Sequence, residues 1–244
     1  VTGVQTCALP ISGVKPIQNN PRRVPVPLKE QLKETIDEMV QEAVLAKVNT
    51  PTEWISNMVV VKKASGKLRV CLDPIHLNRA IKRNRYPMKT IEEIAPKLHK
   101  ARVFSVADAK AGFTQVELDD PSSYLTTFWT PYGRYRWLRM PYGISSAPEE
   151  FQRRLDECLE GLENVIATHD DILIYGTGDN DDEATRAHDK ALQALLERCR
   201  QKQLKLNKDK LKLKLPSVSY MGHVISKEGI SADPAKIQAI LEMP

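Results

Sequence analysis

The segment Val165-Ile-Ala-Thr-His-Asp170-Asp171-Ile-Leu-Ile-Tyr175 decides the fold, because two apolar runs flank a short polar break in it. Both runs are apolar enough to form buried strands. The four-residue break between them predicts a hairpin turn that carries Asp170 and Asp171 at its tip. Another short apolar run, residues 103–107, ends at Asp108, whose carboxylate could lie beside the pair.

Three carboxylates that converge on one spot repel each other, so such a cluster persists mainly when divalent cations neutralise it. A ligand set made only of oxygens suits Mg²⁺ or Mn²⁺. Two such ions, roughly 3.5–4 Å apart, can clamp the attacking and leaving oxygens of a phosphoryl transfer. An isolated Asp-Asp pair in a turn is usually a solvated loop, and the spacing alone does not establish a metal site.

Helical and extended patterns alternate on both sides of this segment. Apolar residues at helical spacing predict helices over 32–44, 146–159 and 184–201. Apolar runs around turn residues predict one hairpin from 57–61 with 68–72 and another from 125–129 with 134–138, and residues 211–215 alternate with strand period. Helices interleaved with hairpins and single strands predict an α+β fold.

Composition narrows the class of protein. Among 244 residues, 36 Lys+Arg against 31 Asp+Glu leave a net charge of +5, which permits a polyanionic partner without requiring one. No stretch approaches the roughly 20 apolar residues that cross a bilayer, so no membrane partner is expected. The four scattered cysteines predict neither a zinc site nor a disulfide framework. A reducing, intracellular location is expected.

The two segments at the start of the chain differ from the rest. VTGVQTCALPI, residues 1–11, looks like a translated sequencing adapter and lacks the basic start and apolar core of a signal peptide. We therefore expect residues 1–13 to be an assembly artefact. Residues 14–27 are rich in Pro and Arg, which predicts an extended arm.

Four motifs follow one another in the chain: Phe104-Ser-Val-Ala-Asp108-Ala-Lys-Ala-Gly-Phe113, Leu138-Arg-Met-Pro-Tyr142-Gly143, His169-Asp-Asp-Ile-Leu-Ile-Tyr175 and Tyr220-Met-Gly-His-Val-Ile-Ser226. Their order and spacing resemble reverse transcriptases, and are most similar to those of gypsy-type long-terminal-repeat retrotransposon polyproteins. The resemblance implies a right-hand polymerase fold. It places the fingers and palm over 28–226, ending in a primer-grip hairpin, with 227–244 leading to a thumb that is missing here.

The resemblance also implies an activity. This is the two-metal, template-directed addition of deoxynucleotides to a primer 3′-hydroxyl by an RNA-directed DNA polymerase. The implied partners are an RNA or DNA template with its primer and deoxynucleoside triphosphates. The three metal-binding palm aspartates of the family match Asp108, Asp170 and Asp171, which would hold two Mg²⁺ or Mn²⁺ ions.

A nucleotide-binding role is implied for six further residues. Basic side chains of the fingers would contact the triphosphate, and a bulky ring at the steric gate would exclude a ribose 2′-hydroxyl. The matching positions are Lys62, Lys63, Arg69, Phe113, Tyr142 and Gly143. For the two lysines a solvated turn is an open alternative, and for Phe113 an ordinary core position.

The hairpin of Tyr220, Met221, Gly222 and His223 resembles the primer grip. Lysines between 202 and 214 could follow the nucleic-acid backbone or form a solvated face. Three places depart from the family pattern: Thr168 stands where retroviral relatives have an aromatic residue, Lys89 stands where proline is frequent, and Asp73-Pro-Ile-His76 differs from the commoner versions of that stretch.

Two alternatives to a working polymerase core stay open. One is a truncated retrotransposon remnant that at most binds nucleic acid. The other is an RNA-templated RNA polymerase, which Phe113 disfavours because ribonucleotide selection needs room for the 2′-hydroxyl. A retrotransposon enzyme is expected in a cytoplasmic particle or in the nucleus.

Overall fold

The structure is a computed structural model that describes residues 13–63 and 65–242, without the side chains of 235, 236 and 240. The predicted artefact at 1–13 therefore lies outside the described residues, except for Gly13. The chain divides into two compact units. Unit 1 comprises Tyr86–Lys110 and Gln152–Pro244, and unit 2 comprises Thr2–Arg85 and Ala111–Phe151, each as far as it is described.

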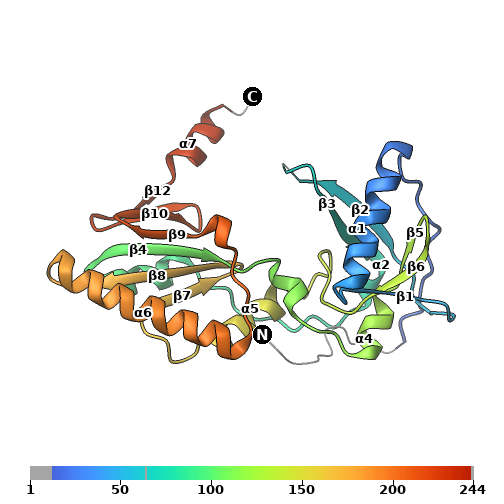
Figure 1. Cartoon of the computed structure of the whole chain (residues 1–244), viewed down its shortest axis with the longest axis horizontal. Coiled ribbons are helices and arrows are strands. Elements are labelled where there is room, and N and C mark those ends of the chain that lie inside the picture. Colours follow the sequence, from blue (N-terminus) through green and yellow to red (C-terminus); the bar gives the residue numbers. More distant parts are fainter. Residues whose placement is uncertain (1–12, 64, 243–244) are drawn as a thin grey trace. The chain divides into compact units, whose positions relative to one another are not determined.

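Unit 1 is built on a four-stranded antiparallel sheet in the order β7-β8-β4-β9 (Figure 1). Its strands are β4 (Ala101–Asp108), β7 (Val165–Thr168), β8 (Asp171–Thr177) and β9 (Lys212–Leu215). The central strands β4 and β8 are mostly buried, as their nearly continuous apolar sequences predict. Their register pairs Asp108 with Asp171, so these two carboxylates share one end of the sheet.

Helix α6 (Asp181–Lys202) packs along the sheet against β8 and β4 (Figure 1). Its first turn is acidic and its last turn basic, and the Asn180 side chain caps it by accepting the Glu183 N–H. The strand approaches the helix so closely that a Cβ on Gly176 would lie 1.9 Å from the Ala184 carbonyl oxygen. Glycine is therefore required where β8 passes under α6.

A second, smaller sheet of unit 1 has the order β10-β11-β12 and contacts β4. Phe104, Tyr175 and Ile225 belong to the core cluster that the two sheets share. The elements outside the main sheet are α3 (Ile91–Ile94), η2 (Ala95–Leu98), η4 (Lys208–Lys210), β10 (Ser217–Tyr220), β11 (His223–Ser226), β12 (Gly229–Ala232) and α7 (Pro234–Leu241). Helix α5 (Ala147–Leu159) begins in unit 2 and continues into unit 1.

Unit 2 contains a β-hairpin and a three-stranded sheet in the order β1-β6-β5. The hairpin pairs β2 (Asn57–Lys62) with β3 (Leu68–Asp73), as predicted. The other elements of unit 2 are η1 (Val26–Leu28), α1 (Lys29–Gln41), β1 (Leu45–Lys47), α2 (Ile75–Ala80), η3 (Gly112–Gln115), α4 (Asp120–Leu125), β5 (Phe128–Thr130) and β6 (Gly133–Trp137).

The α+β prediction is confirmed, whereas several predicted boundaries are wrong; the helix expected over 184–201, for example, begins at Asp181. The helix expected over 32–44 ends at Gln41, because Ala43 adopts a φ of 54° and turns the chain toward β1. The second hairpin begins at Phe128 instead of 125, because the preceding residues form α4. The Asp119 carboxylate caps that short helix by accepting the Ser122 N–H.

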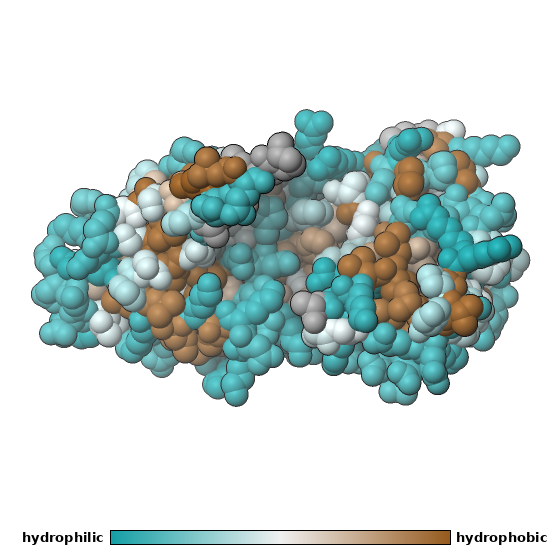
Figure 2. Space-filling model, turned by 90° about the horizontal axis from the view of Figure 1, so that it is seen from above, coloured by the Kyte–Doolittle hydropathy of each residue, from teal (hydrophilic) through white to brown (hydrophobic). Residues whose placement is uncertain are grey.

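The surface drawn in Figure 2 mixes broad hydrophilic areas with separate apolar patches. Exposed apolar side chains include Leu213 and Leu215 on the edge strand β9. No helix within 13–63 and 65–242 is both long and apolar enough to cross a bilayer.

Candidate active site

The carboxylates of Asp108, Asp170 and Asp171 gather at one end of the unit 1 sheet. Asp108 is the last residue of β4, and Asp171, the first residue of β8, is its direct partner in the ladder. Thr168 pairs with Asp171, so the loop consists of only His169 and Asp170, two residues fewer than the predicted break. The Asp170 carbonyl accepts the Ala109 N–H at 2.7 Å, which ties the loop to the end of β4.

A lysine occupies part of this acidic site. The Lys210 ammonium donates to Asp108 Oδ2 at 2.8 Å, although the two residues are 102 positions apart. The side-chain Nδ2 of Asn207 donates to Asp108 Oδ1 at 3.4 Å, and the backbone N–H of Asn207 donates to the Asp108 carbonyl at 2.8 Å. The Asp108 side chain is 14% exposed and that of Lys210 is 63% exposed, so the cation covers the carboxylate from the solvent side.

The electrostatics of the site favour a bound cation. Partial burial raises the pKa of the Asp170 and Asp171 carboxyls, and the negative charge of Asp108 raises both pKa values further. The carboxylate of Asp108 in turn holds the pKa of Lys210 above its usual value. Since like charges at directly opposed positions destabilise a β-ladder, a positive charge placed among these side chains is stabilising.

The residues present fit a divalent metal ion in their chemistry. Asp170 Oδ1 is shielded from solvent and accepts no hydrogen bond from any described residue, which is costly unless a ligand satisfies it. All three side chains offer the oxygen ligands that Mg²⁺ prefers. Their arrangement is not that of a formed metal centre: among the described residues, no three His, Cys, Asp or Glu side chains are placed to hold one ion.

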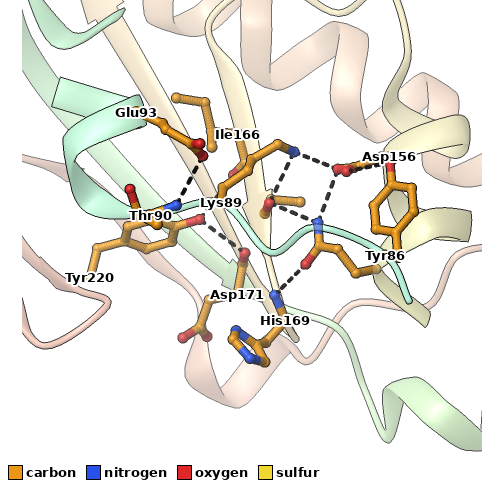
Figure 3. A network of polar contacts seen from close by, with 11 residues as sticks. Tyr86, Lys89, Thr90, Glu93, Asp156, Ile166, His169, Asp171 and Tyr220 are labelled. Atoms are coloured by element: carbon orange, nitrogen blue, oxygen red, sulfur yellow. Dashed lines mark hydrogen bonds and ion pairs between the residues drawn. The ribbon is translucent and has the colours of Figure 1, made fainter. Parts of the chain in front are cut away.

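The loop that carries Asp170 is a tight two-residue hairpin loop. His169 adopts a φ of 55°, in the left-handed region that such loops use and that histidine adopts more often than most residues. The His169 N–H donates to Gln152 Oε1 at 2.7 Å. Figure 3 shows this loop beside Tyr86, Lys89 and Asp156.

In unit 2, three of the predicted nucleotide-binding residues form a stack. The Arg69 guanidinium lies 5.1 Å from the centre of the Tyr142 ring, a cation–π contact. The ring centroids of Tyr142 and Phe113 are also 5.1 Å apart, and Phe113 in turn meets Phe151 edge-on. Half-buried Phe113 therefore has packing partners and still keeps an accessible surface.

The other three predicted nucleotide-binding residues, Lys62, Lys63 and Gly143, are not members of this stack. Lys62 ends β2 and Lys63 follows in the turn, and both are exposed. Gly143 has a φ of 112°, and a Cβ there would lie 2.0 Å from the Leu72 carbonyl oxygen. The lack of a side chain at Gly143 therefore allows its backbone to pack closely against β3 of the same chain.

The predicted primer-grip residues form the β10–β11 turn. Tyr220 pairs with His223, while Met221 and Gly222 form a two-residue loop with φ angles of 51° and 74°, as expected of a tight hairpin. The Tyr220 side chain is 2% exposed, and its hydroxyl lies 3.3 Å from the Ile166 carbonyl and 3.4 Å from that of Asp171. Burial raises the pKa of Tyr220. Its side chain supports the strands beside the carboxylates.

Sequence reasoning missed four residues next to the carboxylate site. Lys210 was anticipated only as one of a run of lysines, and Lys89 only as a departure from the family pattern. Gln152 ends a motif, residues 138–152, that resembles the family, but no role was predicted for it, and Asp156 carries no signal beyond its place in an amphipathic helix. Their contacts join segments far apart in the chain, so local pattern has no means of showing them.

Comparisons with known proteins show the family to which the chain belongs. The family model for reverse transcriptase (RNA-dependent DNA polymerase) matches residues 61–225. The chain is 31% identical over 219 residues to the retrovirus-related Pol polyprotein from transposon 297 of Drosophila melanogaster, covering 88% of this chain and 20% of that protein. It is 30% identical to the corresponding polyprotein from transposon gypsy of the same organism, covering 80% of this chain and 19% of the other. The chain thus spans about a fifth of these relatives.

The fold is likewise similar to a solved structure. A foamy viral protease–reverse transcriptase in complex with double-stranded DNA superposes with a TM-score of 0.83 at 19% sequence identity. The match covers 100% of this chain and 41% of that one. At this sequence identity the structural similarity is evidence for the fold alone, which is the fingers-and-palm architecture expected from the motifs.

Proposed function

The chain belongs to the reverse transcriptase family, and from that membership we propose that it is the fingers and palm of an RNA-directed DNA polymerase. The observation that carries the proposal is the carboxylate cluster of Asp108, Asp170 and Asp171, with the solvent-shielded Asp170 Oδ1 lacking a donor among the described residues. In a retrotransposon remnant without catalytic activity such a cluster would only destabilise the fold, which counts against that alternative.

In this proposal Asp108, Asp170 and Asp171 hold two Mg²⁺ or Mn²⁺ ions. Bound there, the ions supply charge stabilisation for the primer 3′-hydroxyl and for the incoming triphosphate. The aspartates act as ionised oxygen ligands, and Lys210 keeps Asp108 paired until a cation competes for it. The raised pKa values of Asp170 and Asp171 mean that a bound cation and deprotonation of these carboxyls favour each other.

The residues of unit 2 bind the nucleotide. Arg69 offers a fork of N–H donors to phosphate oxygens, and Lys62 and Lys63 act as point charges. Tyr142 orients the Arg69 guanidinium by the cation–π contact. The Phe113 ring, held by Tyr142 and Phe151, fills the space that a ribose 2′-hydroxyl would need.

The partners follow from the same proposal. The DNA-bound foamy viral relative and the net charge of +5 support a primer–template as the polyanionic partner. The turn of Met221 and Gly222 would hold the primer end, since the buried Tyr220 anchors it to the sheet. We place the enzyme inside the cell, in a retrotransposon particle or in the nucleus.

Primer extension on an RNA template tests the proposal. The chain should add deoxynucleotides in Mg²⁺ or Mn²⁺, and Phe113→Ala should raise ribonucleotide incorporation at least tenfold while deoxynucleotide incorporation continues. An exposed aspartate of η4, changed in Asp209→Asn, serves as the matched control for Asp170→Asn, which should abolish extension. Preferential use of ribonucleotides by the unaltered chain would favour the RNA polymerase alternative, and absence of extension would favour the remnant.

A further inference from the structure

The His169–Asp170 loop sets where the Asp170 side chain points. The φ of 55° at His169 is one that two-residue hairpin loops use and that histidine tolerates better than most residues, and Met221 has a similar φ of 51° in the β10–β11 turn. Because a short hairpin turn fixes only the local backbone, the contacts between the loop and other elements identify what else holds it.

Besides the bond from the Ala109 N–H to the Asp170 carbonyl, the loop is held by the Gln152 side chain. This side chain of α5 is fully buried, and its Oε1 accepts the His169 N–H at 2.7 Å. Its Nε2 donates to the Ala167 carbonyl at 3.1 Å and to Asp156 Oδ1 at 3.0 Å. The Gln152 amide thus bonds both the loop and the strand β7 that leads into it. Its three partners determine which amide atom is Oε1 and which is Nε2.

Asp156 and Lys89 hold Gln152 in turn. The Lys89 ammonium donates to Asp156 Oδ1 at 2.5 Å and to the Ala167 carbonyl at 3.3 Å. The Tyr86 hydroxyl donates to Asp156 Oδ2 at 3.1 Å. Both carboxylate oxygens are therefore engaged, and the ion pair is partly buried, with exposed fractions of 31% for Lys89 and 20% for Asp156 (Figure 3).

We propose that Gln152, Asp156 and Lys89 form a brace of positioning residues that holds the His169–Asp170 loop in one conformation and thereby aims the Asp170 carboxylate. The brace touches none of the three aspartate side chains, so it acts through the loop backbone. Its effect on catalysis rests on the proposed polymerase function, whereas its effect on the loop does not.

Amide hydrogen exchange at His169 tests the brace without reference to activity. In the full chain this amide should be protected, because its N–H is bonded to a buried acceptor. Gln152→Met keeps the size of the side chain and removes all three bonds, and should speed exchange at His169 at least tenfold. Lys89→Met, at a more accessible position than Gln152, should speed it two- to fivefold.

The matched control is Lys100→Met. It breaks an ion pair of the same length, 2.5 Å between Lys100 Nζ and Asp179 Oδ1, near the opposite end of β4 and β8. Exchange at His169 should not change in this variant. Unchanged exchange at His169 in both Lys89→Met and Gln152→Met would overturn the proposal, and so would equal acceleration by Lys100→Met.

Mn²⁺ affinity and kinetics separate positioning from general stability. Gln152→Met should weaken Mn²⁺ binding about tenfold and lower kcat for extension with little change in the KM for deoxynucleotide. Lys89→Arg, which keeps the charge, should restore most of the loss seen in Lys89→Met. If the unaltered chain extends no primer but the exchange results hold, the proposed function fails and the brace stands. If extension occurs and exchange is insensitive to the brace, only the brace fails.

Discussion

At the scale of single residues, Asp170 carries a conflict between stability and chemistry. Its carboxyl is partly buried, faces two other carboxylates, and has one oxygen without a donor among the described residues. An ionised group in that position is unfavourable for folding, whereas a metal ligand must be ionised.

Asp170→Asn should therefore stabilise the metal-free chain while it removes catalysis. The gain comes from removing a partly buried negative charge that two carboxylates repel, and about 1 kcal/mol is the expected order of magnitude, which corresponds to a rise in Tm of roughly 2–4 °C for a chain of this size. Thermal unfolding in EDTA measures it, with Asp209→Asn as the control. A Tm below that of the unaltered chain would contradict this account.

The pH dependence of that gain has a defined sign. The Asp170 pKa is raised in the folded chain above its usual 3.8. At pH values between 3.8 and this raised pKa, the folded chain therefore binds more protons than the unfolded chain. This unfavourable contribution to the free energy of unfolding is absent at pH values below 3.8 and grows as pH rises through the raised pKa. The Tm difference between Asp170→Asn and the unaltered chain should accordingly increase from pH 4 to pH 7. A gain that shrinks as pH rises would refute the assignment of the raised pKa.

At the scale of elements, the buried core strands were predictable and their ends were not. Continuous Val, Ile and Leu residues predict β7 and β8, and the same pattern places Asp108 at the end of β4. The conformation of the loop depends on Gln152, and the cover on Asp108 depends on Lys210, 102 residues later. Such contacts are set by packing between distant segments, so hydrophobic periodicity carries no information about them.

The edge strand β9 is held to β4 by a buried polar network that the sequence also conceals. Ser105 Oγ lies 2.7 Å from His188 Nε2 and accepts the Lys214 N–H at 2.9 Å. We assign the Nδ1–H of His188 to Asp189 Oδ1, 3.0 Å away, so that the serine hydroxyl donates to Nε2. Ser105 and His188 are fully buried, so this Ser-His-Asp arrangement is a structural one.

Ser105→Ala should lower the free energy of unfolding by about 1–3 kcal/mol, because it leaves a buried imidazole nitrogen and the Lys214 N–H without a partner. Chemical denaturation followed by circular dichroism measures the change. Ser217→Ala, at an exposed strand position, is the control and should lie within about 0.5 kcal/mol of the unaltered chain. Equal stabilities of the two variants would show that the network contributes nothing.

At the scale of the whole molecule, the position of the positive charges bears on nucleic-acid binding more than the overall composition does. The net charge of +5 is modest, but exposed lysines are concentrated around η4 and β9, next to the carboxylate site. Binding to an RNA–DNA primer–template should weaken with salt, since each phosphate contact releases counterions. The double variant Lys208→Ala/Lys212→Ala should reduce the slope of log affinity against log salt by about 1.5–2. An unchanged slope would assign these lysines to a solvated face.

The predictable part of the molecule is the part encoded by continuous motifs: the α+β class, the family, and the placement of Asp108 and of the Asp170–Asp171 pair at the ends of buried strands. The two-unit division and the stack of Arg69, Tyr142 and Phe113 join segments from distant parts of the chain. The stack could be suspected only because each member lies in a motif that resembles the family.

The central claim is that Asp108, Asp170 and Asp171 form the metal site on which extension depends. The most direct test is a Mn²⁺ titration followed by electron paramagnetic resonance, with a chain-terminated primer–template and a deoxynucleotide present. The unaltered chain should bind two Mn²⁺ ions, and Asp108→Asn and Asp170→Asn should each weaken binding at least tenfold while Asp209→Asn does not. Equal Mn²⁺ binding by all four proteins would contradict the account.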